Sequence, residues 1–306
     1  MNILLAIDSS PPGNAAAQFI QNIEFPHGSS LHLLKVVDPK HLVDVSSKKP
    51  KKKNTSSGTS VQSHETDKAW QLMNQLCQRM EDPTRETIPL VSVGNPGAEI
   101  LSVIEHHKID LVVLGTHSRR GLNRFLLGSV SEWIVTEAPC STLIIRGKTR
   151  TKKSKGMNIL LASDGSPDAD TAVRFLKSVE FPQSSKLTLL HVVKKHFYQT
   201  EQLVTTIKKT SSDFVQSAED LLQERGREGA ELLENIRTMV QETGLNVNEH
   251  LAFGYEADEI LKCAKRIRAD LIILGSKGVT NLRKFLLGSV SSKIVRHAPC
   301  SVLVVR

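Results

Sequence analysis

The chain contains two copies of one sequence, and this duplication constrains its fold more than any other feature. The opening segment MNILLAIDSSP at residues 1–11 returns as MNILLASDGSP at 157–167. Similarity is strongest toward the end of each copy, where 19 of 36 aligned positions are identical between 111–146 and 271–306. Because each copy is long enough to bury a core of its own, the sequence predicts two versions of one domain.

The repeat divides the 306 residues into a first domain at 1–146, a linker at 147–156 and a second domain at 157–306. The linker GKTRTKKSKG lacks the apolar residues that a core needs, which is typical of a domain boundary. Formal net charge is +8, but the linker and the segment 46–60 together carry ten basic residues and no acid. The positive charge therefore belongs to two connectors, and nucleic acid is not an expected partner.

Targeting and metal-binding signals are missing from the sequence. No apolar stretch approaches the roughly 18 residues that span a bilayer, and the first residues carry no basic leader, so we expect a cytoplasmic chain without a membrane partner. Four cysteines show no CxxC pair and no metal-ligand spacing, so we expect small buried residues rather than a zinc site or a disulfide framework. They are Cys77, Cys140, Cys263 and Cys300.

Short runs of β-branched residues and leucine alternate with helical segments in each half. Ser10 and Ser166, each followed by proline, are typical residues for a helix N-cap. The alternation predicts an α/β fold of two repeated doubly wound domains, each a five-stranded parallel sheet with helices on both faces. A longer helical stretch covers about 211–243, although Gly226 and Gly229 leave its continuity open. Strands of the first half are expected at 2–7, 31–37, 87–93, 110–114 and 142–146.

Ligands of such sheets bind at the carboxyl ends of strands, where the strand order reverses. In the second half the fourth strand is followed by GSKGVTNLRKFLLGSVSS, with glycines at 275, 278 and 288 and a serine at 289. Gly275 and Gly278 would permit a positive φ and a close approach of the backbone, and Gly288-Ser289 would open a helix whose amide groups attract an anion. This spacing predicts a phosphate-binding loop.

The corresponding loop of the first half, GTHSRRGLNRFLLGSVSE, departs from this pattern. Ser118 takes the place of Gly278, although Arg119 and Arg120 could still attract phosphate. Ser129 and Glu132 have the spacing of a capping box, which explains the serine without a ligand. The first site is therefore expected to be degenerate or specialised.

On these residues each half resembles a universal stress protein domain, and the whole chain resembles a tandem member of that family. The family signature is Gly, two residues, Gly, nine residues, then Gly followed by Ser or Thr, and the second half matches it completely. The first half matches only at Gly115, Gly128 and Ser129, and Ile7 replaces the small Ser163. The resemblance implies the doubly wound fold, and ATP binding where the signature is kept.

Site residues follow from the resemblance position by position. In the second half the adenine and ribose side would be lined by Ala162, Ser163, Asp164 and Val192. The ribose and phosphates would be held by Gly275, Gly278, Gly288, Ser289, Val290 and Ser291. The weaker candidates of the first half are Asp8, Val36, Gly115, Gly128, Ser129, Val130 and Ser131. Asp164 would meet ribose hydroxyls or Mg²⁺, and the nucleotide would be ATP, ADP or AMP.

These features predict a nucleotide-binding module of the stress response rather than an enzyme, because no repeated constellation supplies a catalytic base. Two alternatives stay open: a slow ATPase or related adenine-nucleotide enzyme, and a tandem scaffold that binds no nucleotide. The resemblance also implies an intramolecular pseudo-dimer through the final strands at 142–146 and 302–306. A homodimer and a protein partner of unknown identity are further options.

Overall fold

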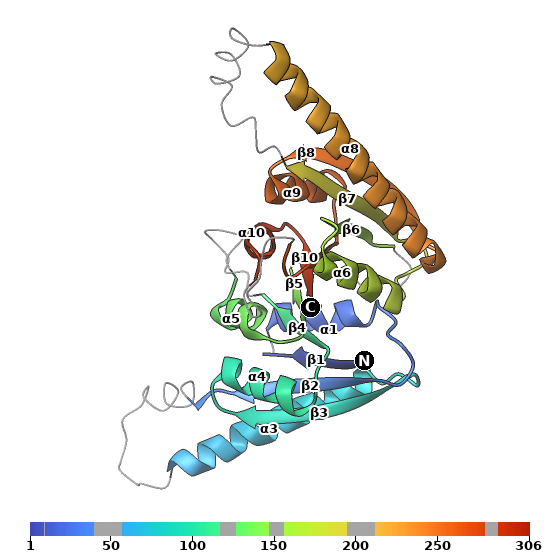
Figure 1. The fold of residues 1–306 in the computed structure, drawn as a ribbon. Helices are drawn as coiled ribbons and strands as arrows, with labels where there is room; N and C mark the ends of the chain where they lie inside the picture. The colour runs from blue at the N-terminus through green and yellow to red at the C-terminus, as the bar shows by residue number, and fades with distance from the viewer. Residues whose placement is uncertain (9, 40–56, 117–126, 147–155, 195–211, 279–286) are drawn as a thin grey trace. The chain divides into compact units, whose positions relative to one another are not determined.

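The computed structural model describes residues 1–8, 10–39, 57–116, 127–146, 156–194, 212–278 and 287–306. The chain forms two compact units of the same architecture (Figure 1). In the first unit the strands are β1 (Asn2–Ala6), β2 (Ser29–Val37), β3 (Arg85–Val93), β4 (Leu111–Gly115) and β5 (Ser141–Ile145). Its helices are α1 (Pro11–Ile20), α3 (Ser57–Arg79), α4 (Pro96–His106) and α5 (Ser129–Glu137).

The second unit repeats this order of elements. Its strands are β6 (Asn158–Ala162), β7 (Lys186–Lys194), β8 (Asn246–Gly254), β9 (Leu271–Gly275) and β10 (Ser301–Val305). Its helices are α6 (Pro167–Ser178), α8 (Ser212–Val240), the 3-10 turn η1 (Gln241–Thr243), α9 (Glu256–Arg266) and α10 (Ser289–His297). The strands expected from the first copy are confirmed, each to within two residues of its observed ends.

Both sheets are parallel and doubly wound, as expected. The first has the order β3-β2-β1-β4-β5, and the second has the order β8-β7-β6-β9-β10. In the second unit α6 and α8 contact each other, and so do α9 and α10, which places two helices on each face of the sheet. The strand order reverses between β6 and β9, whose register runs from Ile159↔Leu271 to Ala162↔Leu274. This reversal is where a ligand site is expected.

Helix starts follow the local signals that the sequence carries. The side chain of Ser10 accepts a hydrogen bond from the Gly13 amide at 3.4 Å, and Ser166 accepts one from Ala169 at 3.3 Å. Both N-caps are thus confirmed. The segment 46–60 is in part helical, since α3 begins at Ser57, so its last four residues belong to a helix rather than to a connector.

The long helix α8 is continuous through both of its glycines. In Figure 1 it runs along β7 and β8, as α3 runs along β2 and β3. A Cβ added to Gly229 would lie 2.7 Å from His191 Cδ2 and 2.8 Å from Leu251 Cδ1. Close packing of the helix against the sheet therefore favours a glycine here and outweighs its low helix propensity.

Each sheet is buried between its helices by aliphatic side chains. Leu4, Val112, Leu160 and Ile272 are fully buried, and the same holds for most residues of the central strands. Cys140, Cys263 and Cys300 are buried and Cys77 is half-buried, and none of these four described residues forms a disulfide. No helix in the part of the chain that the structure describes is long and apolar enough to cross a membrane. The expected pairing of the final strands concerns the placement of the two units and stays a prediction.

A histidine pair distinguishes the core of the first unit from that of the second. His32 on β2 is 5% exposed, and its ring centroid lies 4.7 Å from that of His107. Ser30 Oγ donates to Asn2 Oδ1, so it accepts from His32 Nε2, which leaves His32 Nδ1 buried and without a partner among the described residues. Burial lowers the pKa of His32, His107 lowers it further, and Glu86 partly opposes them.

We predict that the first unit loses stability in acid through His32. Its pKa in the unfolded chain is near 6.5, so as pH falls below that value the unfolded state takes up a proton that the folded state resists. Urea unfolding at about pH 7.5 and pH 5.5 tests this, and both tryptophans, Trp70 and Trp133, lie in the first unit and report on it. His32→Thr, which copies the aligned Thr188, should reduce the loss, whereas the exposed control His27→Thr should not.

Candidate functional site

A cavity of about 600 Å³ lies at the carboxyl ends of β6, β7 and β9 in the second unit. It brings together residues that are more than 100 positions apart in the sequence. All ten residues expected in the second half line it: Ala162, Ser163, Asp164, Val192, Gly275, Gly278, Gly288, Ser289, Val290 and Ser291. The expected grouping of these residues is therefore found around one space large enough for a small-molecule ligand.

The N-terminus of α10 opens toward this cavity without a side chain to cap it. Gly288 is the N-cap residue, with φ −61° and ψ 155°, and the first turn holds no acidic residue. Ser291 Oγ donates to the Gly275 carbonyl at 2.8 Å, and the Gly288 amide donates to the Ser276 carbonyl at 2.8 Å. These bonds hold the end of β9 against the helix start, where amide groups and the helix dipole favour an anion.

Close packing, rather than a positive φ, explains the glycines that follow β9. Neither Gly275 nor Gly278 has a positive φ, so that part of the sequence expectation was wrong. A Cβ at Gly275 would lie 2.7 Å from the Asp168 backbone carbon, and one at Gly278 would lie 2.6 Å from Asp164 Oδ2. Gly278 thus lets the Asp164 carboxylate sit against the loop.

Asp168 was missed by sequence reasoning and fixes the start of the loop. Its Oδ2 atom accepts from Ser276 Oγ at 2.7 Å and from the Lys277 amide at 3.0 Å. Ser166 Oγ also lies 3.4 Å from the Lys277 carbonyl, to which it donates. In the first repeat Pro12 stands in place of Asp168 and supplies no acceptor. The sequence difference between SPD at 166–168 and SPP at 10–12 could have indicated this role of Asp168.

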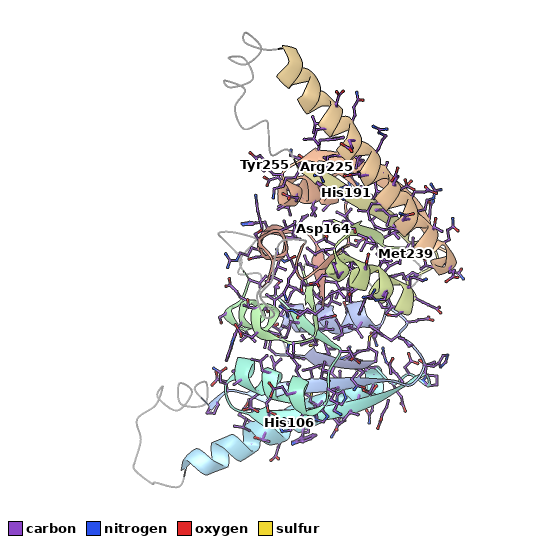
Figure 2. The ribbon with its side chains drawn as sticks, in the orientation of Figure 1. His106, Asp164, His191, Arg225, Met239 and Tyr255 are labelled. Carbon is purple, nitrogen blue, oxygen red and sulfur yellow. The ribbon has the colours of Figure 1, made fainter. Side chains whose placement is uncertain are left out.

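Helix α8 forms a wall of the cavity that the family signature does not include. Leu222, Arg225, Gly229 and Leu232 line the cavity at spacings of three and four, which places them on one helix face. The same spacing in the sequence could have indicated that this helix face lies against the site. Figure 2 labels Arg225 on α8 together with His191 on β7 and Asp164 beyond β6.

Charged groups at the cavity form ion pairs with each other. Arg225 pairs with Glu228 at 3.5 Å, and Lys194 pairs with Glu256 at 3.0 Å. All four residues line the cavity, as does Lys277. These pairs are largely exposed and contribute little to stability. They place both signs of charge where a charged ligand would enter.

The first unit presents a different surface at the equivalent positions. Ile7 is buried where Ser163 stands in the second unit, and Asp8 Oδ1 accepts bonds from the amide and hydroxyl of Ser10. Gly115 packs against the Pro12 backbone, and a Cβ there would approach it to 2.5 Å. Val36 is half-buried at the end of β2. His117, Ser118, Arg119 and Arg120 lie outside the described residues.

The capping box expected at Ser129 and Glu132 is wrong. Gly128 is the N-cap of α5, so Ser129 is already the first residue of the helix, and no side chain caps this helix start. Val130 and Ser131 follow in the first turn, where Ser131 Oγ lies 3.5 Å from the Gly115 carbonyl. Glu132 also belongs to that turn, and its negative charge disfavours a bound phosphate.

Charge at the helix wall is reversed between the two units. The buried residues Ala69, Met73, Leu76 and Met80 of the first repeat match Gly229, Leu233, Ile236 and Val240 of the second. In this alignment Glu65 corresponds to Arg225, and Lys68 corresponds to Glu228. Strand register likewise shows that Lys35 of the first unit is the counterpart of His191. Lys35 follows Leu34, the partner of Ala6 on β1, and His191 follows Leu190, the partner of Ala162 on β6. Burial lowers the pKa of Lys35, opposed by the charges of Asp8 and Glu65.

We predict that Asp168→Ala loosens the start of the loop. The change leaves the buried Ser276 hydroxyl and the Lys277 amide without their acceptor, at a cost of about 1–3 kcal/mol. Hydrogen exchange at Lys277 should accelerate. Asp170→Ala is the control, because it removes the other acid of the first turn of α6 and so loses the same favourable charge at the helix N-terminus. Equal acceleration in both variants would contradict a positioning role for Asp168.

Known proteins of one family are similar in sequence to each of the two repeats. The model of the universal stress protein family matches residues 1–146 and 157–306. The universal stress protein YxiE of Bacillus subtilis is 33% identical over 148 residues, which are 48% of this chain and 97% of that protein.

Solved structures share the fold over the whole chain. A universal stress protein from Archaeoglobus fulgidus is 21% identical with a TM-score of 0.65, covering 100% of this chain and 98% of the other. A functionally unknown protein from Pseudomonas aeruginosa is 16% identical with a TM-score of 0.63, covering 99% and 92%. With both halves matched by the family model, the chain belongs to the universal stress protein family as a tandem, two-domain member.

Proposed function

We propose that the second unit binds an adenine nucleotide, ATP in the first place, in the cavity at the carboxyl ends of β6, β7 and β9. One observation carries this proposal: the complete glycine signature, the uncapped start of α10 and Asp164 all line the same cavity. Main-chain amide groups at a helix start suit phosphate, and the leucines of α8 that line the cavity suit a base. A Cβ at Gly278 would enter this space, which supports a close approach of the loop to a ligand.

Within the cavity the residues divide by the part of the nucleotide they fit. Ser289 and Val290 would hold phosphate oxygens through their amide groups, and Gly288, whose own amide is bonded to the Ser276 carbonyl, would position them. Asp164 lies against Gly278, where it would meet ribose hydroxyls or help to hold Mg²⁺. Magnesium bound there would neutralise phosphate charge, and the chain itself supplies the carboxylate. ADP and AMP would use the same contacts with fewer phosphates.

The role that fits this site best is a nucleotide-dependent binding module. Bound ATP would stabilise the loop in one conformation and shift the population of a surface that another chain recognises. Slow hydrolysis is the competing activity, and turnover of ATP with Mg²⁺ that disappears in Gly278→Val would establish it. The first unit, with Ile7, Lys35 and Glu132 at the equivalent positions, is proposed as a specialised repeat that binds ATP far more weakly.

We predict that one site per chain binds ATP and that Gly278→Val weakens it at least tenfold, about 1.4 kcal/mol. The larger side chain would collide with Asp164 Oδ2. Titration calorimetry of the full chain measures this. Ser118→Val at the matching position of the first repeat is the control and should bind like the unmodified chain. Equal loss in both variants, or no heat with the unmodified chain, would contradict the proposal.

We also predict that saturating ATP slows hydrogen exchange at the start of α10. The amides of Ser289 to Ser291 should be protected more than those of Ser129 to Ser131, because the first unit has an acid in that turn. Mass spectrometry of peptides from the full chain separates the two segments. Unchanged exchange at both segments would refute ordering of the loop by ATP.

A further inference from the structure

His191 is a polar residue of the cavity that neither the signature nor the phosphate contacts use. It lies on β7, and its Nδ1 atom is 2.9 Å from the Ser163 carbonyl oxygen. A carbonyl oxygen only accepts, so Nδ1 carries the hydrogen. In the neutral ring Nε2 is then an acceptor, and it has no hydrogen-bond partner among the residues that the structure describes.

The ring is held from two sides. Ser163 fixes the Nδ1 edge, and α8 packs against the opposite edge, where a Cβ at Gly229 would lie 2.7 Å from Cδ2 and 3.4 Å from Nε2. Because Nδ1 is turned toward the backbone after β6, Nε2 lies on the ring edge that faces α8, where His191 and Gly229 both line the cavity. A fixed ring of this kind presents an acceptor whose direction does not have to be organised when a ligand binds.

Strand order places this acceptor at the base end of the proposed nucleotide. The phosphate loop follows β9, Asp164 follows β6, and His191 lies on β7, in the order β9-β6-β7. Neighbouring strands are about 4.8 Å apart, so His191 lies about 10 Å from the phosphate loop across the sheet edge. Leu222 and Leu232 of α8 line the same cavity and offer an apolar surface to a flat ring.

We propose that His191 Nε2 accepts a hydrogen bond from the 6-amino group of adenine and thereby selects the base. This inference rests on the proposed nucleotide site and adds its base specificity. The first repeat agrees with it, since Lys35 stands at the equivalent position and an ammonium group can only donate. The unit that lacks the complete loop therefore also lacks this acceptor.

Purine riboside triphosphate tests the proposal because it differs from ATP only in lacking the amino group. The full chain should bind ATP about three- to tenfold more tightly than this analogue, the effect of one neutral hydrogen bond. His191→Asn keeps a donor near the Ser163 carbonyl but has no atom at the place of Nε2, so the two ligands should bind it equally. His191→Gln, which places an amide oxygen near that position, should restore part of the preference.

The possible outcomes separate this inference from the proposal on which it depends. If ATP binds but the unmodified chain shows no preference over the analogue, base selection by His191 is wrong and the nucleotide site stands. A preference that His191→Asn leaves unchanged overturns the inference in the same way. If ATP does not bind at all, both proposals fail. Should His191→Asn not fold, the preference of the unmodified chain and its change in His191→Gln still decide the question.

Discussion

The parallel pairing of β6 with β9 is the constraint on which the rest of the site depends. Its register, from Ile159↔Leu271 to Ala162↔Leu274, brings the chain beyond β6 next to the chain beyond β9. Asp164 consequently meets Gly278, and α6 supplies Asp168 to the first residues of the loop. A shift of this register would separate the carboxylate from the loop and leave the helix start without a matching surface.

The two repeats show how one scaffold can keep its core while its ligand edge changes. The strands and their buried aliphatic residues are nearly the same in both units. Differences gather at the carboxyl ends of the strands, where Ile7 replaces Ser163, Pro12 replaces Asp168 and Lys35 replaces His191. Both units keep the same order of strands despite these differences, so the fold tolerates changes at the ligand edge. We infer that the second unit retained the ligand site and the first unit diverged.

The fold could be predicted from sequence because strand and helix signals repeat twice and agree with each other. Buried β-branched runs gave the strands, and Ser-Pro pairs gave two helix starts. Loop spacing together with the family resemblance likewise identified ten residues that line one cavity. The expected positive φ at the glycines was wrong, since Gly278 instead accommodates the Asp164 side chain from the loop after β6, and a contact between two loops leaves no local pattern.

The α8 wall and His191 were also beyond the sequence reasoning. Their place in the site depends on how closely α8 approaches the sheet at Gly229, and the sequence alone left the continuity of this helix open. Gly226 and Gly229 suggested an interruption when taken alone, because propensity describes an isolated helix and not one packed on strands. The charge reversal at Glu65 and Arg225 became visible only once buried positions aligned the two helices.

A crystal structure of the full chain grown with a non-hydrolysable ATP analogue tests the central claim most directly. The account predicts that density for phosphates lies at the amide groups of Ser289 and Val290, with the base beside His191 and α8. Weak or no density is expected at the start of α5. Density at the first unit alone, or a second-unit cavity closed by its own side chains, would contradict the account.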